Sequence, residues 1–256
     1  MADELVLAST PAEGVRVLAF NRPAKRNALS QDLITVFLQH LLEASRDRAV
    51  RAIILTGSST FFSAGADIKE ISELDADAAR GRRYLADLCA GMRAVRKPLI
   101  AAVEGIALGG GFEVALMCDL IFASTTSRLG LPEVTIGLIP GAGGTQRLTN
   151  ALGKFKAMQM ILLGTPISAT EAHSAGLVAQ LFEPGRVLES VVQTASGLAE
   201  LSPAALSLAK EAVCRSDDLG CDHDLERSLY YFAFGTRDKD EGVKAFIEKR
   251  TPSWNI

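Results

Sequence analysis

The chain has 256 residues, of which 48% are apolar and 22% are charged, and its net charge at pH 7 is −3. These values are ordinary for a globular protein and leave room for one large domain or two smaller ones. The negative charge argues against nucleic-acid binding as the main task. The three histidines share no metal-ligand spacing, and no stretch approaches the ~20 apolar residues that cross a bilayer. We therefore expect no metal site and no membrane span.

The first third of the chain predicts alternating strands and helices. Apolar runs predict strands over 15–20 and 52–56, and a 3.6-residue apolar period between them predicts a helix that Ser30 caps. Another long helix is predicted over 75–96. The order of strand, helix and strand favours an α/β arrangement.

Two corners rich in small residues follow predicted strands. Ser63 to Ala66 are small, and Asp67 is placed to cap the segment that follows. Residues 98–103 form an apolar run typical of a buried strand, and residues 109–111 are three glycines that open a helix with Glu113 in its first turn. Small residues at such corners let a ligand approach the bare backbone. On local features alone, structural interpretations stay open for both corners: a tight strand-to-helix turn for residues 63–67, and a dipole-stabilised structural carboxylate for Glu113.

A second carboxylate and a third glycine-rich segment come next. Glu133 follows Pro132 in an apolar setting, and residues 136–145 form a glycine-rich loop that opens a helix. The glycines of this loop have neither the spacing of a phosphate loop nor that of a dinucleotide-binding turn. Ser168 begins a sequence that resembles a capping box. The remaining sequence predicts helices over 155–163, 187–201, 203–215, 219–234 and 239–250.

Several motifs in register resemble the enoyl-CoA hydratase (crotonase) family, over about residues 13–253. They are the runs 21–23, 27–29, 64–69, 105–113, 131–133, 139–147 and 246–250. The resemblance implies an α/β fold: a crotonase (ClpP-like) spiral of ββα units with a C-terminal helical trimerisation region. We accordingly expect a spiral core domain over 1–198 and a C-terminal helical region over 199–256, working as one functional unit.

The resemblance also implies a ligand and a reaction. The ligand is an acyl-CoA thioester, and the motif match assigns the two backbone N–H groups that bind the thioester oxygen to Ala66 and Gly110. Glu113 and Glu133 match the family's two hydratase glutamates and are the candidate catalytic residues. The implied activity is the reversible addition of water to 2-trans-enoyl-CoA, giving 3-hydroxyacyl-CoA, in fatty-acid or related acyl-CoA degradation. No cofactor is expected, because CoA is part of the substrate.

Further positions match the family's substrate contacts. These are Lys25, Arg26, Ala28, Ala64, Asp67, Ile68, Lys69, Gly109, Phe246 and Lys249. For Lys25 and Lys69 the alternative of ordinary solvated lysines stays open. The family also implies a homotrimer or a hexamer made of two trimers, which the many apolar residues of the last two predicted helices favour.

Two other interpretations stay open. Another crotonase-fold acyl-CoA enzyme, such as an enoyl-CoA isomerase or a hydratase of one specialised pathway, would share the fold, although family members that catalyse isomerisation often lack one or both of the two glutamates. An RNA-binding crotonase homologue would need a lysine-rich exposed helix, whereas residues 31–46 contain no lysine. The sequence indicates neither the acyl chain length nor the physiological direction. The expected compartment is the cytoplasm, or the mitochondrial matrix if a leader has been removed.

Overall fold

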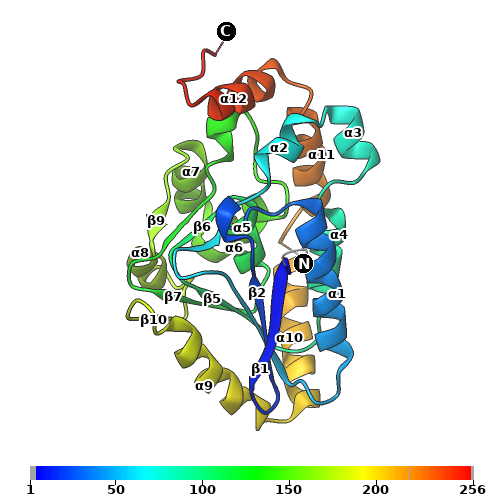
Figure 1. Ribbon diagram of the computed structural model, residues 1–256, viewed down its shortest axis with the longest axis vertical. Coiled ribbons are helices and arrows are strands. Elements are labelled where there is room, and N and C mark those ends of the chain that lie inside the picture. The colour runs from blue at the N-terminus through cyan, green and yellow to red at the C-terminus, as the bar shows by residue number, and fades with distance from the viewer. Residues whose placement is uncertain (1–3, 219, 255–256) are drawn as a thin grey trace.

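The computed structural model describes residues 4–218 and 220–254 and shows a mixed α/β fold (Figure 1). The strands are β1 (Val6–Ala12), β2 (Val15–Phe20), β3 (Ala52–Thr56), β4 (Phe61–Ser63), β5 (Leu99–Val103), β6 (Ile106–Leu108), β7 (Leu120–Ser124), β8 (Arg128–Gly130), β9 (Ile167–Ser168) and β10 (Gln180–Phe182). The helices are α1 (Gln31–Arg46), α2 (Ile68–Ser72), α3 (Ala76–Gly81), α4 (Ala86–Arg93), α5 (Gly110–Leu116), α6 (Gly144–Leu152), α7 (Lys154–Leu162), α8 (Ala169–Ser174), α9 (Val187–Ala199), α10 (Pro203–Asp218), α11 (His223–Ala233) and α12 (Arg237–Glu248). Two short 3-10 helices are η1 (Pro23–Lys25) and η2 (Glu133–Ile136).

Two β-sheets organise the described residues. The larger sheet has the strand order β1-β2-β3-β5-β7-β10, and the smaller one has the order β4-β6-β8-β9. Three times in succession the chain passes from a strand of the larger sheet to one of the smaller sheet, through β3 and β4, β5 and β6, then β7 and β8. Helical segments follow each pair, so the repeated ββα unit and the predicted α/β class are confirmed.

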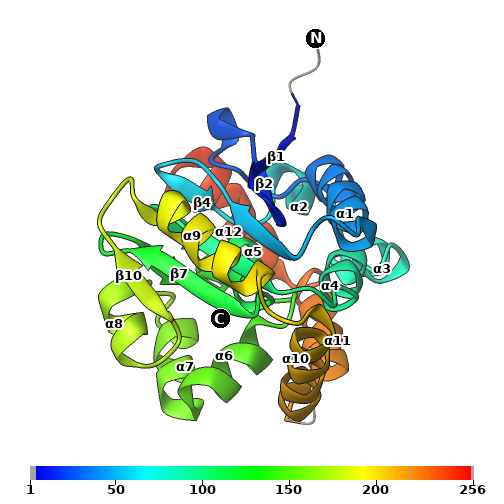
Figure 2. The ribbon, with the colours of Figure 1, turned by 90° about the horizontal axis from the view of Figure 1, so that it is seen from below.

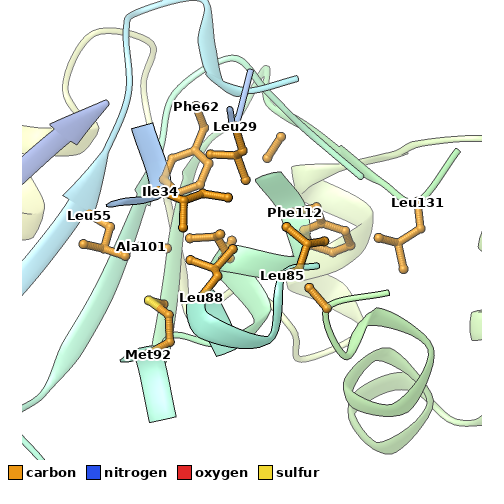
Figure 3. Packing of buried hydrophobic residues seen from close by; sticks show 14 of the residues in the cluster. Leu29, Ile34, Leu55, Phe62, Leu85, Leu88, Met92, Ala101, Phe112 and Leu131 are labelled. Atoms are coloured by element: carbon orange, nitrogen blue, oxygen red, sulfur yellow. The ribbon is translucent and has the colours of Figure 1, made fainter. Parts of the chain in front are cut away.

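The two faces of the larger sheet pack into different cores. In β3, Ile53 and Leu55 belong to the main core, whereas Ala52 and Ile54 belong to a smaller one beneath α9, because successive side chains of a strand point to opposite faces. Figure 2 shows α9 lying across this sheet, and α9 contacts β2, β3, β5 and β7. Figure 3 shows part of the main core, in which Phe62 of the smaller sheet lies near α1 and β3.

Three helices begin at side-chain caps that the sequence predicted. The Ser30 hydroxyl accepts a hydrogen bond from the Leu33 N–H at 3.3 Å. The Asp67 carboxylate accepts one from the Lys69 N–H at 3.0 Å and caps α2. Ser168 caps α8 in the same way. These caps satisfy backbone N–H groups that have no partner inside the helix.

The predicted long helix over 75–96 is wrong, because the chain forms α3 and α4 with a break between them. Arg83 and Leu85 have φ values of 51° and 64°, in the left-handed region that non-glycine residues rarely adopt. Tyr84 between them is buried, and its ring stacks on that of Tyr230 with the centroids 6.5 Å apart. Packing of Tyr84 therefore selects a backbone conformation that local propensity opposes.

The C-terminal helices α11 and α12 pack against helical segments that follow strands of the smaller sheet. α12 packs against α2 and η2, as the top of Figure 1 shows for α2. The start predicted at residue 219 lies outside the described residues, and α11 begins at His223. Tyr230 and Phe234, expected among the apolar side chains for a neighbouring subunit, are instead buried in the core. The division into regions 1–198 and 199–256 stays a prediction.

Candidate active site

Three short parallel strands end at one edge of the smaller sheet. β4 pairs with β6, and β6 pairs with β8. Just past the strand ends, the Gly109 N–H donates to the Gly130 carbonyl at 2.9 Å. The segments that follow these strands therefore leave the sheet next to one another. They are residues 64–67, 109–113 and 131–133, which carry most of the predicted site.

Two backbone corners face each other at this edge. A Cβ atom built on Gly110 would lie 3.6 Å from the Ala66 nitrogen, and one built on Gly65 would lie 3.4 Å from the Gly110 nitrogen. Leu29 forms an isolated bridge with Ala66, and its N–H donates to the Gly65 carbonyl at 2.8 Å. Gly110 is the first residue of α5, so its N–H has no acceptor within the helix. The structure thus brings together the two predicted N–H donors, Ala66 and Gly110.

Glu113 is buried in the first turn of α5, as predicted. Its Oε1 accepts hydrogen bonds from the N–H groups of Ala142 at 2.8 Å and Gly144 at 2.7 Å. Burial and the nearby charge of Glu226 raise the pKa of Glu113 to about 7, although the two N–H groups favour the ionised form. A carboxyl group with such a pKa can take up and release a proton near neutral pH.

Glu133 is the first residue of η2, and its carboxyl group has a different environment. Its Oε2 is buried and has no hydrogen-bond partner among the described residues. Burial and the charge of Glu113 raise the pKa of Glu133 well above the ordinary value, which favours the protonated form. A buried carboxyl oxygen without a partner is unfavourable for stability, and such groups gather at functional sites.

Gly109 contacts both glutamates. Its carbonyl accepts the Glu113 N–H at 2.9 Å, and a Cβ built on it would lie 3.2 Å from Glu133 Oε1. The φ of Gly109 is +51° with a ψ of −133°, a combination that favours glycine. A side chain at this position would press on the Glu133 carboxyl group. The backbone conformation therefore favours glycine here, and the close approach of Glu133 adds to this preference.

The structure adds a carboxylate that the sequence analysis missed. Glu226 of α11 is buried, and its Oε1 accepts the Gly143 N–H at 2.5 Å. Its Oε2 accepts the Thr145 N–H at 2.7 Å and also the Thr145 hydroxyl. Glu226, Tyr230 and Ala233 follow the i, i+4, i+7 spacing of one helix face, and all three are buried. A glutamate within an apolar stripe is the signal that could have identified it.

The predicted CoA-binding positions near the N-terminus surround the same corner. The Arg26 carbonyl accepts the Ala64 N–H at 3.0 Å, so the segment with Lys25, Arg26 and Ala28 lies beside the segment with Ala64. Lys25 and Lys69 are exposed. Their side chains are therefore free to meet an anionic ligand, and the structure equally allows them to be solvated surface lysines.

Asp67 and Ile68 lie between Ala66 and Lys69, but Asp67 is occupied by two structural contacts. Its Oδ2 accepts a hydrogen bond from Arg22 at 2.5 Å, and its Oδ1 caps α2. The structure therefore gives the Asp67 side chain a role in holding the corner. Its predicted substrate contact, like that of Ile68, stays a prediction.

Phe246 lies on α12, and Lys249 directly follows the last residue of that helix. Both are exposed, and Lys249 ends the helix in the left-handed region with a φ of 54°. α12 contacts η2, the 3-10 helix that begins at Glu133. Phe246 and Lys249 are thus on a helix that touches the site, while their contact with CoA stays a prediction.

The described residues contain neither a metal-binding cluster nor a membrane-spanning helix. In residues 4–218 and 220–254, no group of three or more His, Cys, Asp or Glu side chains is arranged to hold a metal ion. Over the same ranges, every helix is too short or too polar to cross a membrane.

Comparisons with known proteins agree on one family. The model of the family described as enoyl-CoA hydratase/isomerase matches residues 10–256. The chain is 44% identical over 242 residues to the 2,3-dehydroadipyl-CoA hydratase of Escherichia coli K12, covering 94% of each chain. It is 46% identical over 256 residues to a probable enoyl-CoA hydratase of Rhizobium meliloti, covering 98% of this chain and 97% of that one. A solved enoyl-CoA hydratase subunit I from Geobacillus kaustophilus superimposes with a TM-score of 0.81 at 39% identity, covering 98% of both chains.

Proposed function

The chain belongs to the enoyl-CoA hydratase/isomerase family, and we propose that Glu113 and Glu133 act together as its catalytic carboxyl groups. Its activity is the reversible addition of water to 2-trans-enoyl-CoA, giving 3-hydroxyacyl-CoA. The observation that supports the pair most directly is their proximity: both buried carboxyl groups have raised pKa values, the charge of Glu113 contributes to the raised pKa of Glu133, and Gly109 contacts both residues. Adding water across a double bond needs one group to accept a proton and another to donate one.

In the proposed mechanism the thioester oxygen binds the N–H groups of Ala66 and Gly110. As water attacks Cβ, negative charge develops on this oxygen, and each aligned N–H donor contributes roughly 3 kcal/mol to its stabilisation. Ionised Glu113 takes a proton from the attacking water, and protonated Glu133 delivers its proton to Cα. The water oxygen bonds to Cβ, and the former double-bond electrons form the new Cα–H bond.

The division of roles follows from the surroundings of the two groups. Glu113 accepts two backbone N–H bonds, which favour its ionised form. Oε2 of Glu133 has no such partner among the described residues, and its surroundings favour the protonated form. Because the two groups interact, they titrate as a pair, and measured pKa values belong to the pair.

We propose that the CoA end and the acyl end of the substrate bind at two neighbouring places around this corner. Cations at Lys25, Arg26 and Lys69 are suited to the phosphates of CoA. Beyond Tyr84 and Leu85 lies a pocket of about 840 Å³ between α1, α2 and the α3–α4 break, with the size to receive an acyl tail. Tyr84 lines this pocket, and its ring stacks on that of Tyr230. Tyr230 in turn packs on Gly141, which directly precedes the turn whose N–H groups bind Glu113.

We further propose a homotrimer, or a hexamer of two trimers, that needs no cofactor. α10 has no buried residue, and large apolar side chains are exposed on the C-terminal helices. They include Leu208, Val213, Leu225, Leu229, Phe232 and Phe246. A partner subunit would remove this surface from water. The proposed compartment is the cytoplasm, or the mitochondrial matrix after removal of a leader.

The proposed function is tested by replacing each glutamate with its amide. Glu113→Gln and Glu133→Gln should each lower kcat by at least about a hundredfold while KM changes little, since the main CoA contacts are untouched. Hydration is followed by the loss of absorbance of the conjugated enoyl thioester. Glu183→Gln, at an exposed glutamate, is the matched control and should keep wild-type kinetics. If Glu133→Gln hydrates at a near-normal rate, Glu133 is structural and an isomerase becomes the better assignment.

A further inference from the structure

The turn over residues 142–145 is held by two carboxylates in strict alternation. Glu113 accepts the first and third of its four consecutive backbone N–H groups, and Glu226 accepts the second and fourth. Glu113 comes from α5 and Glu226 from α11, 83 residues beyond Gly143 in the chain. The turn is thus fixed from two sides by buried charged acceptors, which form stronger hydrogen bonds than neutral ones do.

The helix that carries Glu226 is itself anchored. The Arg227 guanidinium donates to the Tyr84 carbonyl at 3.3 Å, and the Tyr231 hydroxyl donates to the same carbonyl at 3.1 Å. Tyr230 packs directly on Gly141 and leaves no room for a side chain there. Glu226 is therefore presented to the turn by a helix that has little freedom to shift.

We propose that Glu226 is a positioning residue for the hydration reaction, holding the turn 142–145 so that two of its N–H groups stay aimed at Glu113 Oε1. This inference rests on the proposed catalytic role of Glu113. With Oε1 bound twice, the Glu113 carboxyl group is fixed in rotation, and Oε2 is the oxygen left to accept a proton from water. Misplacement of a catalytic group by about 1 Å can lower a rate roughly a hundredfold. Glu226 acts through the turn and touches no reacting atom.

The same carboxylate also acts on Glu113 through space. Its negative charge, after burial, is a cause of the raised pKa of Glu113. The titratable and charged groups that face Glu113 are Glu226 and Tyr230 from α11, Glu133 from η2, Arg147 from α6 and Cys89 from α4. Loss of the Glu226 charge leaves the opposing Arg147 charge in place, so the pKa of Glu113 should fall.

The test compares three variants of the full chain. Glu226→Gln removes the charge and replaces one acceptor oxygen by an NH₂ group, which then faces the N–H of either Gly143 or Thr145. Glu226→Asp keeps the charge but shortens the side chain. Asp224→Asn, at an exposed carboxylate on the first turn of the same helix, is the matched control. Each is assayed for kcat, KM and the pH dependence of kcat/KM, with circular dichroism to report folding.

We expect Glu226→Gln to lower kcat about tenfold to a hundredfold with little change in KM. The acidic limb of its kcat/KM profile should move to lower pH by roughly one unit, because a neighbouring negative charge is gone. Glu226→Asp should lower kcat but leave that limb near its wild-type position. Asp224→Asn should change neither. A folded Glu226→Gln variant with wild-type kcat and pH profile, or an equal change in Asp224→Asn, overturns the proposal.

Hydrogen exchange does not depend on catalysis, so it tests whether Glu226 holds the turn independently of whether the assigned reaction is correct. Hydrogen exchange of the peptide that spans the turn 142–145 should quicken in Glu226→Gln and stay slow in Asp224→Asn. If the wild-type protein fails to hydrate enoyl-CoA, the assigned reaction fails, while exchange still reports whether Glu226 holds the turn. If Glu226→Gln does not fold, Thr145→Val, which removes one hydroxyl bond to Glu226 Oε2, takes its place. A folded Thr145→Val variant with unchanged exchange and kcat then overturns the proposal.

Discussion

Replacing Glu113 by glutamine should make the protein more stable above neutral pH while abolishing most of its activity. Burial and the Glu226 charge raise the pKa of Glu113 from an ordinary value of 4.5 to about 7. The folded state therefore holds this proton more tightly than the unfolded state does. The contribution of Glu113 to stability is most favourable below the unfolded pKa and is lost as the pH rises through the folded pKa.

The magnitude follows from the difference between the two pKa values. At about 1.4 kcal/mol per pH unit, the ionised carboxylate reduces the free energy of unfolding by about 3 kcal/mol above pH 7. Glutamine occupies the same volume, carries no charge, and its carbonyl oxygen can accept both N–H groups that Oε1 now accepts. Glu113→Gln should thus gain up to about 3 kcal/mol near pH 8.5 and less than about 1 kcal/mol near pH 5.

The assay is urea unfolding at fixed protein concentration, near pH 5 and near pH 8.5, for the wild type, Glu113→Gln and the surface control Glu183→Gln. Fixed concentration matters because subunit association contributes to apparent stability. A stability gain that is equal at both pH values would show that ionisation of Glu113 does not lower the free energy of unfolding. A loss of stability near pH 8.5 would show that the two charge-assisted hydrogen bonds outweigh burial, and the account of the raised pKa would be wrong.

Two further predictions concern the ligand and the assembly. Lys25→Ala combined with Lys69→Ala should raise KM for the CoA substrate several-fold and leave kcat near its wild-type value, whereas an unchanged KM would mark both as ordinary surface lysines. Sedimentation at micromolar concentration should give the mass of a trimer or hexamer, since the exposed apolar side chains of α10 to α12 are unfavourable in water. A monomer mass would contradict the second prediction.

Local sequence patterns predicted the central strands well. Apolar runs located β3 and β5 within one residue, because buried parallel strands are apolar on both faces. β1 was missed, since only Val6 of its seven residues is buried and its sequence includes Pro11. Such an edge strand has neither the alternation nor the apolar run that strand prediction depends on.

Conformations and contacts set by tertiary packing were beyond local prediction. Neither Arg83 nor Leu85 is a glycine, and nothing nearby in sequence indicates that both adopt left-handed φ values. Glu113 and Glu133 were identified by their resemblance to family motifs, with roles that stay predictions. Glu226 was not. Its place in an apolar helix stripe could indicate that it is buried, but its partners lie 81 and 83 residues away and no local pattern indicates them.

The long separation between the turn 142–145 and Glu226 has a consequence for synthesis of the chain. At translation rates of roughly 5–20 residues per second, the turn leaves the ribosome roughly 4–17 s before the glutamate that holds it. Until then, two of its N–H groups can be satisfied only by water or by transient partners, and Glu113 lacks a rigid support. We expect the nascent chain to assemble both sheets first and to acquire a competent catalytic geometry only when its last helices are made.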